Sequence, residues 1–177
     1  PYTAVRDFLG DIGGKRILDY ACGTGWTSIF FARSGAQCHG IDISAKSIAV
    51  ANRTAVINEV GSRCDFRVGS GENLPYADET FDFVVTIGCL HHTGDLALAM
   101  REVHRVLKPG QRAMIMVYNA LSYRQWLRSP IEAYRRMKTP DFKWSNADAN
   151  LRSAYDANRE GIAAPSTTFI SSREAQE

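Results

Sequence analysis

The sequence lacks the features that mark a secreted, metal-binding or membrane-spanning chain. Its four cysteines are scattered over 177 residues, without a CxxC pair or the clustering of a zinc site. We therefore expect no bound metal, and reduced thiols in a reducing compartment are the simplest interpretation. No apolar stretch is as long as a membrane span, and no signal peptide stands at the beginning. These absences favour a cytoplasmic protein.

A surplus of charge of either sign is also absent. The 21 lysine and arginine residues nearly balance the 19 aspartate and glutamate residues, which leaves a net charge of +2. This value is too small to argue for nucleic acid or an acidic membrane surface as a partner. The composition, 45% hydrophobic and 23% charged, is that of an ordinary globular domain that buries a core without disulfides or metals.

Short apolar runs alternate with segments of helical period from Lys15 to Asn119. The predicted strands are residues 15–20, 36–43, 64–70, 81–89 and 111–119. The predicted helices are residues 26–35, 44–61 and 95–110; Ser44 caps the second, and Leu96, Met100, Val103 and Leu107 form the apolar stripe of the third. This alternation predicts an α/β fold with a doubly wound, mostly parallel sheet. Ligands of such sheets bind beyond the carboxyl ends of the strands.

The domain boundaries follow from where this pattern stops. We expect residues 1–120 to form the Rossmann-like domain and residues 121–177, which are more polar, to form a helical lid or a substrate-facing segment. The chain begins at Pro1 without a methionine, and its last residues, SSREAQE, are typical of the start of a helix. We therefore expect the sequence to be part of a longer protein.

A loop of small residues follows the first predicted strand. That strand ends in Asp19 and Tyr20, and the loop 21–25, with sequence ACGTG, leads into a helix. Small residues at positions 21, 23 and 25 let backbone amides approach a ligand, and the amino end of a helix favours a carboxylate or phosphate. Taken alone, the loop is better explained as a tight turn from strand to helix.

An acidic residue at the end of the second predicted strand strengthens the case for a ligand. Asp42 lies 17 residues after Gly25, where a nucleotide-like ligand would place its ribose hydroxyls. Its alternative role is to cap a helix beside Ser44. Together, the loop and the carboxylate define a site of adenosine length.

The loop also lacks the third glycine of a dinucleotide-binding fingerprint. The order is GTGWTS, with Ser28 at the third position and the bulky Trp26 directly after the second glycine. The negative charge of Asp19 suits a ligand with a cationic amino group and a sulfonium better than a pyrophosphate. The residues therefore favour S-adenosylmethionine, and an NAD-dependent oxidoreductase is the weaker alternative.

The loops after the other strands fit the same ligand. Ser70, Gly71 and Glu72 follow the third strand, where an adenine ring would lie, and Ile43 and Leu74 could cover the two faces of the ring. Backbone carbonyls of Ile87 or Gly88, after the fourth strand, would face the methionine part. Each of these segments can also be an ordinary turn.

Five motifs in order carry a family resemblance: LDYACGTG, GIDIS, SGENLPYADETFD, LHH and EVHRVLKPGQ. They resemble the class I S-adenosylmethionine-dependent methyltransferases, in particular the UbiE/methyltransferase-11-like group, over about residues 15–119. The expected cofactor-binding residues are Asp19, Tyr20, Ala21, Gly23, Thr24, Gly25, Asp42, Ile43, Ser70, Gly71, Glu72, Ile87 and Gly88. Ala21 replaces the first glycine of the group, and Ser70 replaces its usual aspartate. The group also adds strands after the fifth, which are not evident here.

The resemblance implies methyl transfer from S-adenosylmethionine to a small-molecule acceptor, with S-adenosylhomocysteine as product. If the acceptor must lose a proton, His91 and His92 are the candidate bases, although a structural role is the alternative for each. His39 and His104, inside a predicted strand and helix, are expected to be structural. A non-catalytic module that binds S-adenosylmethionine is the remaining alternative. Neither nucleic acid nor a membrane span is expected, and the sequence does not indicate the oligomeric state.

Overall fold

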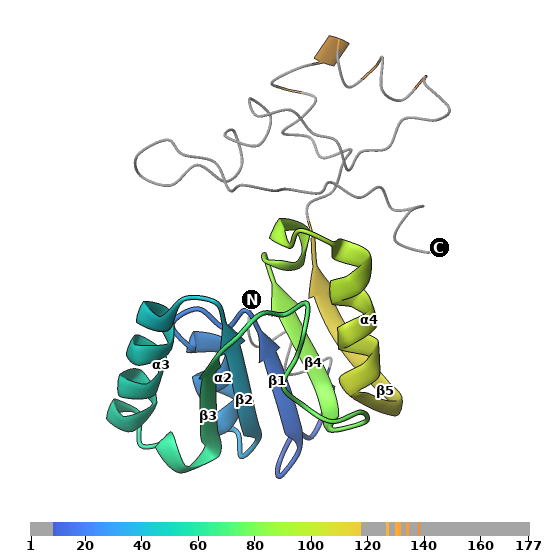
Figure 1. The fold of residues 1–177 in the computed structure, drawn as a ribbon. Coiled ribbons are helices and arrows are strands. Elements are labelled where there is room, and N and C mark those ends of the chain that lie inside the picture. Colours follow the sequence, from blue (N-terminus) through green and yellow to red (C-terminus); the bar gives the residue numbers. More distant parts are fainter. Residues whose placement is uncertain (1–8, 118–126, 128–129, 132–133, 135–137, 139–177) are drawn as a thin grey trace. The chain divides into compact units, whose positions relative to one another are not determined.

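The computed structural model describes residues 9–117 and, beyond them, residues 127, 130, 131, 134 and 138 (Figure 1). It divides into two compact units: one comprises residues 1–90 and 97–116, the other residues 91–96 and 117–177. The first unit holds the sheet. The segment predicted as a lid, residues 121–177, lies outside the described residues apart from the five named, which are helical.

The predicted strands and helices form in the predicted order. The strands are β1 Arg16–Tyr20, β2 Gln37–Asp42, β3 Cys64–Val68, β4 Phe81–Ile87 and β5 Leu107–Met116. The α-helices are α2 Trp26–Arg33, α3 Ala45–Ile57 and α4 Leu96–Val106, and two short 3-10 helices, η1 Gly61–Arg63 and η2 Leu90–His92, complete the set. Ser44 caps α3 as predicted, because its Oγ accepts a hydrogen bond of 3.2 Å from the amide of Ser47.

All five strands run parallel in the order β3-β2-β1-β4-β5, which confirms the predicted α/β fold. The chain moves outward from β1 to β2 and β3, then returns to the other side of β1 to form β4 (Figure 1). The strand order therefore reverses at β1 and β4, where Asp19 pairs with Val85. Ligands of doubly wound sheets bind beyond the carboxyl ends of the strands at such a reversal.

The helices α2 and α3 cover one face of the sheet. Their buried side chains join a single apolar cluster with Ile17 of β1, Cys38 of β2 and Val85 of β4. Successive side chains of a strand point to opposite faces. Asp19 therefore shares the face of Ile17, while Leu18 and Tyr20 point to the opposite face. All four β1 side chains from Ile17 to Tyr20 are buried, as expected for a strand that is covered on both sides.

The helix α4 differs in detail from the prediction. Its buried residues are Ala99, Val103 and Val106, whereas Met100 is 41% exposed. The predicted stripe therefore has the wrong orientation, and only Val103 is buried as expected. The helix also ends at Val106 rather than at Pro109-Gly110, since β5 already begins at Leu107 and pairs with Phe81 of β4.

The sequence showed neither strands after the fifth nor a membrane-spanning helix. No sixth or seventh strand occurs among the described residues, whose sheet has five strands. None of the described helices combines the length and the apolar character that crossing a bilayer requires.

Candidate functional site

A hollow of about 240 Å³ opens where the strand order reverses, at the carboxyl ends of β1 and β4. Its lining residues come from β1, the following loop, the start of α2 and the end of β4: Asp19, Ala21, Cys22, Gly23, Thr24, Trp26, Thr27 and Ile87. Five of the residues that the sequence predicted for cofactor binding are thus gathered here: Asp19, Ala21, Gly23, Thr24 and Ile87. Cys22, Trp26 and Thr27 also line the hollow and were not among the predicted cofactor residues.

The loop after β1 owes its shape to three residues with left-handed backbone. The φ angles are 57° at Ala21, 52° at Gly23 and 79° at Gly25. A Cβ on Gly25 would lie 2.8 Å from the ring of Phe66 and 2.9 Å from Ala51, so this glycine lets α2 pack closely. No atom lies within 4 Å of the corresponding position on Gly23. Gly25 is therefore needed for close packing, whereas the absence of a side chain at Gly23 leaves open space beside the hollow.

Asp19 is held at the bottom of the hollow by Ser28. Its Oδ2 accepts hydrogen bonds from the Ser28 amide, at 3.0 Å, and from the Ser28 hydroxyl, at 2.7 Å. Asp19 is only 4% exposed. Burial raises the pKa of this carboxyl from its usual 3.8 to about 6, even though the Ser28 hydrogen bonds lower it. The sequence showed only that Ser28 replaces the third glycine of a dinucleotide fingerprint. The structure shows that this serine binds Asp19.

Asp42 connects the end of β2 to the same loop. Its Oδ2 accepts a hydrogen bond of 2.9 Å from the amide of Gly23, and its Oδ1 accepts one of 2.8 Å from the amide of Ser44. Each carboxylate oxygen has a second acceptor position. Asp42 can therefore hold the loop and still accept from a ligand hydroxyl. The next residue, Ile43, is 79% exposed and presents an apolar side chain beside it.

The loop after β3 passes over the buried end of β1. Gly71 lies so close to the hydroxyl of Tyr20 that a Cβ would collide with it. Tyr20 is 2% exposed and, among the residues the structure describes, its hydroxyl has no hydrogen-bond partner. The buried Tyr20 side chain therefore packs against the loop at Gly71. Ser70 is exposed, and its Oγ accepts a hydrogen bond of 3.2 Å from the amide of Glu72.

The end of β4 carries the remaining predicted residues. Ile87 is 36% exposed and lines the hollow. Gly88 has a φ of 75°, and its amide donates to the carbonyl of Met116 at 3.3 Å. His91 is buried and His92 is half-buried, with 4.0 Å between their ring centroids. Both belong to the second compact unit, so their role as bases stays a prediction.

The thiols do not form a reactive or metal-binding group. All four cysteines are free, and burial raises the pKa of Cys64 and of Cys89 to about 11, so both stay protonated near neutral pH. Among the described residues, no group of three or more histidine, cysteine, aspartate or glutamate side chains could hold a metal ion. His39 and His104 lie inside β2 and α4, where the sequence placed them, and their structural role stays a prediction.

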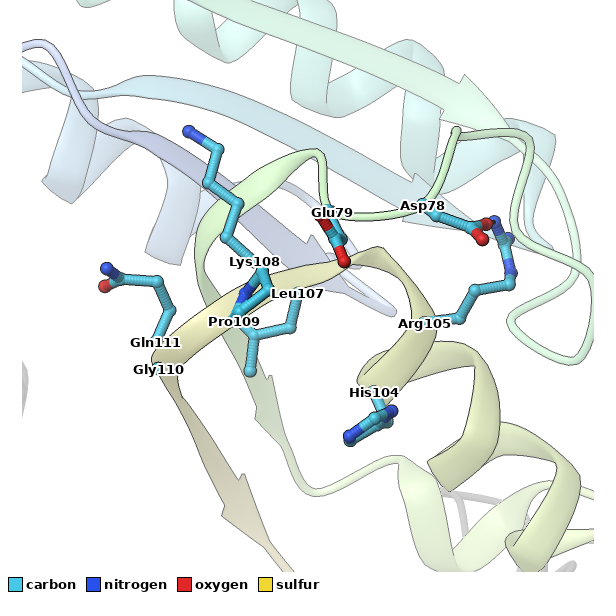
Figure 2. Close-up of a pocket in the computed structure, with 9 residues that line it drawn as sticks. All are labelled: Asp78, Glu79, His104, Arg105, Leu107, Lys108, Pro109, Gly110 and Gln111. Atoms are coloured by element: carbon cyan, nitrogen blue, oxygen red, sulfur yellow. Dashed lines mark hydrogen bonds and ion pairs between the residues drawn. The ribbon is translucent and has the colours of Figure 1, made fainter.

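A larger hollow, of about 470 Å³, lies at the opposite end of the sheet, where β4 and β5 begin (Figure 2). Its charged side chains are largely paired with one another or with neighbours. Arg105 contacts Asp78 at 2.8 Å, and Lys108 contacts Asp82 at 2.9 Å. Ligands of parallel sheets bind at the carboxyl end, so we assign the candidate site to the smaller hollow.

Two sequence relatives have methyltransferase names. Norajmaline N-methyltransferase from Rauvolfia serpentina is 39% identical over 105 residues, which cover 59% of this chain and 36% of the relative. A ubiquinone biosynthesis O-methyltransferase from Azorhizobium caulinodans is 35% identical over 111 residues, which cover 63% of this chain and 43% of the relative. The chain thus spans less than half the length of either relative.

Solved structures share the same architecture. The YcgJ protein from Bacillus subtilis has a TM-score of 0.64 and 26% sequence identity over 77% of this chain and 64% of its own. The [4+2]-cyclase SpnF has a TM-score of 0.61 and 34% identity over 63% of this chain and 42% of its own. The sequence pattern of the methyltransferase domain matches residues 18–115, more than half of the chain. The protein therefore belongs to the methyltransferase domain family.

Proposed function

We propose that the domain binds S-adenosylmethionine in the hollow beside Asp19 and transfers its methyl group to a small-molecule acceptor, leaving S-adenosylhomocysteine. The observation that carries the proposal is a buried carboxylate beneath a left-handed loop, at the strand reversal of a methyltransferase-family sheet. The bound cofactor would supply an electrophilic methyl group, and the protein would supply alignment and shelter from water.

The residues present fit this cofactor along the carboxyl edge of the sheet. Asp19 places negative charge where the cationic methionine part would lie, and the open space at Gly23 admits it. Asp42 keeps acceptor positions for the ribose hydroxyls. Exposed Ile43 and the loop of residues 70–72 provide an apolar face and polar backbone groups for adenine.

The hollow disfavours the dinucleotide alternative. Ser28 stands where a dinucleotide fingerprint has its third glycine, and its hydroxyl is bonded to Asp19. A pyrophosphate in the same place would bring further negative charge beside a buried carboxylate. This electrostatic repulsion supports a cationic ligand over NAD.

The acceptor proposed for this site is a small molecule with an apolar body. Trp26 is 61% exposed although it lines the hollow, and Ile87 lines it from the other strand. Large apolar side chains that remain exposed at a hollow are typical of ligand contacts. The names of the two relatives, an N- and an O-methyltransferase of small molecules, support the same class. His91 or His92 would serve as the base where the acceptor must lose a proton.

A second function deserves a test because one structural neighbour is named a [4+2]-cyclase rather than a methyltransferase. In that case the domain would bind S-adenosylmethionine without transferring its methyl group. Both functions share the cofactor site, and they differ only in whether the methyl group moves.

Calorimetric titration of the protein with S-adenosylmethionine, S-adenosylhomocysteine and NAD tests the cofactor. Binding of the first two and not of NAD is the expected result, and binding of NAD alone would overturn the proposal. Incubation with methyl-labelled cofactor and a panel of apolar amines, phenols and quinols then tests transfer. Release of labelled product establishes the methyltransferase, whereas tight binding without transfer to any acceptor favours the second function.

A further inference from the structure

The segment between β3 and β4 has no helix to give it shape. Residues 69–80 form turns and bends, with only two backbone hydrogen bonds between residues of the described segment, Asn73 to Ser70 at 3.4 Å and Tyr76 to Leu74 at 2.8 Å. This segment carries Ser70, Gly71 and Glu72, the proposed adenine contacts. Its position must therefore be set by groups outside it.

Two side chains of α4, Glu102 and Arg105, hold this segment by its backbone. Oε2 of Glu102 accepts a hydrogen bond of 2.7 Å from the amide of Leu74. The two Nη atoms of Arg105 donate to the carbonyl of Leu74 at 3.1 Å, the carbonyl of Tyr76 at 2.8 Å and the carboxylate of Asp78 at 2.8 Å. Figure 2 shows the Arg105 guanidinium meeting Asp78. We call Glu102 and Arg105 the α4 clamp.

The clamp is rigid because its two members also bind each other. Nε of Arg105 donates to Oε1 of Glu102 at 2.7 Å, and Nη2 donates to Oε2 at 2.8 Å. With the three bonds to the segment, these use all five N–H donors of the guanidinium. The hydrogen bond from Arg105 holds the pKa of Glu102 below its usual value, so the pair stays charged near neutral pH. A lysine has a point charge and cannot reproduce this planar fork.

The clamp acts on the proposed adenine contacts through a short stretch of chain. Before them, Gly69 is tied to the end of β2, because its amide donates to the carbonyl of Asp42 at 3.0 Å. After them, Leu74 is tied to the clamp and is 3% exposed. Only residues 70–73 span the two fixed points, and Gly71 rests on Tyr20. Fixing Leu74 therefore fixes the path of these four residues.

We propose that Glu102 and Arg105 are positioning residues for the cofactor: they pre-shape the loop of residues 70–73 for adenosine without touching it. The inference rests on the proposed S-adenosylmethionine site. Binding to a loop that is already ordered avoids the entropy cost of ordering it, so loss of the clamp appears as loss of affinity. Glu102 and Arg105 are the first and last residues of the EVHR part of the last sequence motif. The clamp therefore assigns a role to a motif that does not line the cofactor hollow.

The test compares Arg105→Lys with Lys108→Ala as a matched control. Lys108 follows α4 closely and forms one partly exposed ion pair with Asp82, which belongs to β4 and not to the segment of residues 69–80. We expect Arg105→Lys to weaken S-adenosylhomocysteine binding by about tenfold in calorimetry, whereas Lys108→Ala changes the Kd by less than about twofold. Hydrogen exchange should quicken at residues 70–78 in Arg105→Lys and return toward the wild-type rate when the ligand saturates the site.

The outcomes separate the two proposals. An unchanged Kd in Arg105→Lys, with wild-type protein that binds S-adenosylhomocysteine, overturns the clamp and leaves the cofactor proposal intact. Wild-type protein that binds neither S-adenosylhomocysteine nor S-adenosylmethionine overturns both. If Arg105→Lys does not fold, Glu102→Gln replaces it, because Glu102 accepts the hydrogen bond of the Leu74 amide and pairs with Arg105. Glu102→Gln removes the charge from this pair and should weaken binding at least about threefold, and an unchanged Kd refutes the clamp.

Discussion

Binding of S-adenosylmethionine should weaken about tenfold when the pH falls from about 7.5 to about 5, because Asp19 then takes up a proton. The pKa of this carboxyl is raised to about 6 by burial. At about pH 5 roughly nine tenths of the molecules carry a neutral Asp19, which cannot attract the cationic ligand. If only protein with an ionised Asp19 binds the ligand, the apparent affinity is proportional to the ionised fraction. This fraction falls by a factor of about ten between the two pH values.

The assay is calorimetric titration at several pH values with wild-type protein, Asp19→Asn and Ser28→Ala. In Asp19→Asn the affinity should be lower and nearly constant over this range, which separates Asp19 from any histidine that titrates nearby. Ser28→Ala removes a hydrogen bond that lowers the pKa of Asp19, so its affinity should begin to fall at a higher pH than in wild type. A wild-type profile that is flat between about pH 5 and 7.5 would refute the assignment of Asp19.

The same carboxyl should make the unliganded protein less stable at neutral pH. Because the pKa is higher in the folded state, about 6 against 3.8, the folded protein binds the proton more tightly. This stabilising contribution is fully present below about pH 3.8 and is lost as the pH rises through about 6. Its loss is worth about 3 kcal/mol from the two pKa values. Asp19→Asn keeps an oxygen for the Ser28 hydrogen bonds, so its free energy of unfolding at neutral pH should exceed that of wild type in urea titration.

Three further substitutions test the remaining contacts. Asp42→Ala should weaken cofactor binding at least about tenfold and lower the Tm, since two backbone amides lose their acceptor; unchanged affinity in calorimetry would remove Asp42 from the site. Gly71→Ala should lower the Tm because its Cβ meets both the hydroxyl and the ring carbon Cζ of Tyr20; an unchanged Tm would contradict the collision. Ala21→Gly should raise the free energy of unfolding by up to about 1 kcal/mol, because the left-handed φ of 57° strains an alanine; a clear loss of stability in urea titration would speak against strain at this residue.

The order of strands and helices was predictable because it depends on local patterns. Runs such as residues 81–87 are apolar without alternation, as in strands covered on both faces, and Ser44 has the chemistry of a helix cap. Once a parallel sheet is inferred, its topology brings the loops after Tyr20 and Asp42 to one edge. The family and the carboxyl-edge location proposed for the site therefore rest on patterns that the sequence already contains.

The hydrogen bonds that shape the loops at the carboxyl edge of the sheet join residues that are distant in the chain. The amide of Gly23 binds a carboxylate 19 residues later, and Arg105 holds carbonyls about 30 residues earlier. The orientation and end of α4 were predicted wrongly because periodicity does not show where β5 must begin in order to pair with Phe81. Sequence by itself determined the class of fold and the family, since both follow from residue type and short-range pattern. Only the tertiary structure decided that Ser28 holds a buried, charge-bearing Asp19 and that α4 shapes the loop after β3, because burial and long-range hydrogen bonds exist only once the sheet has formed.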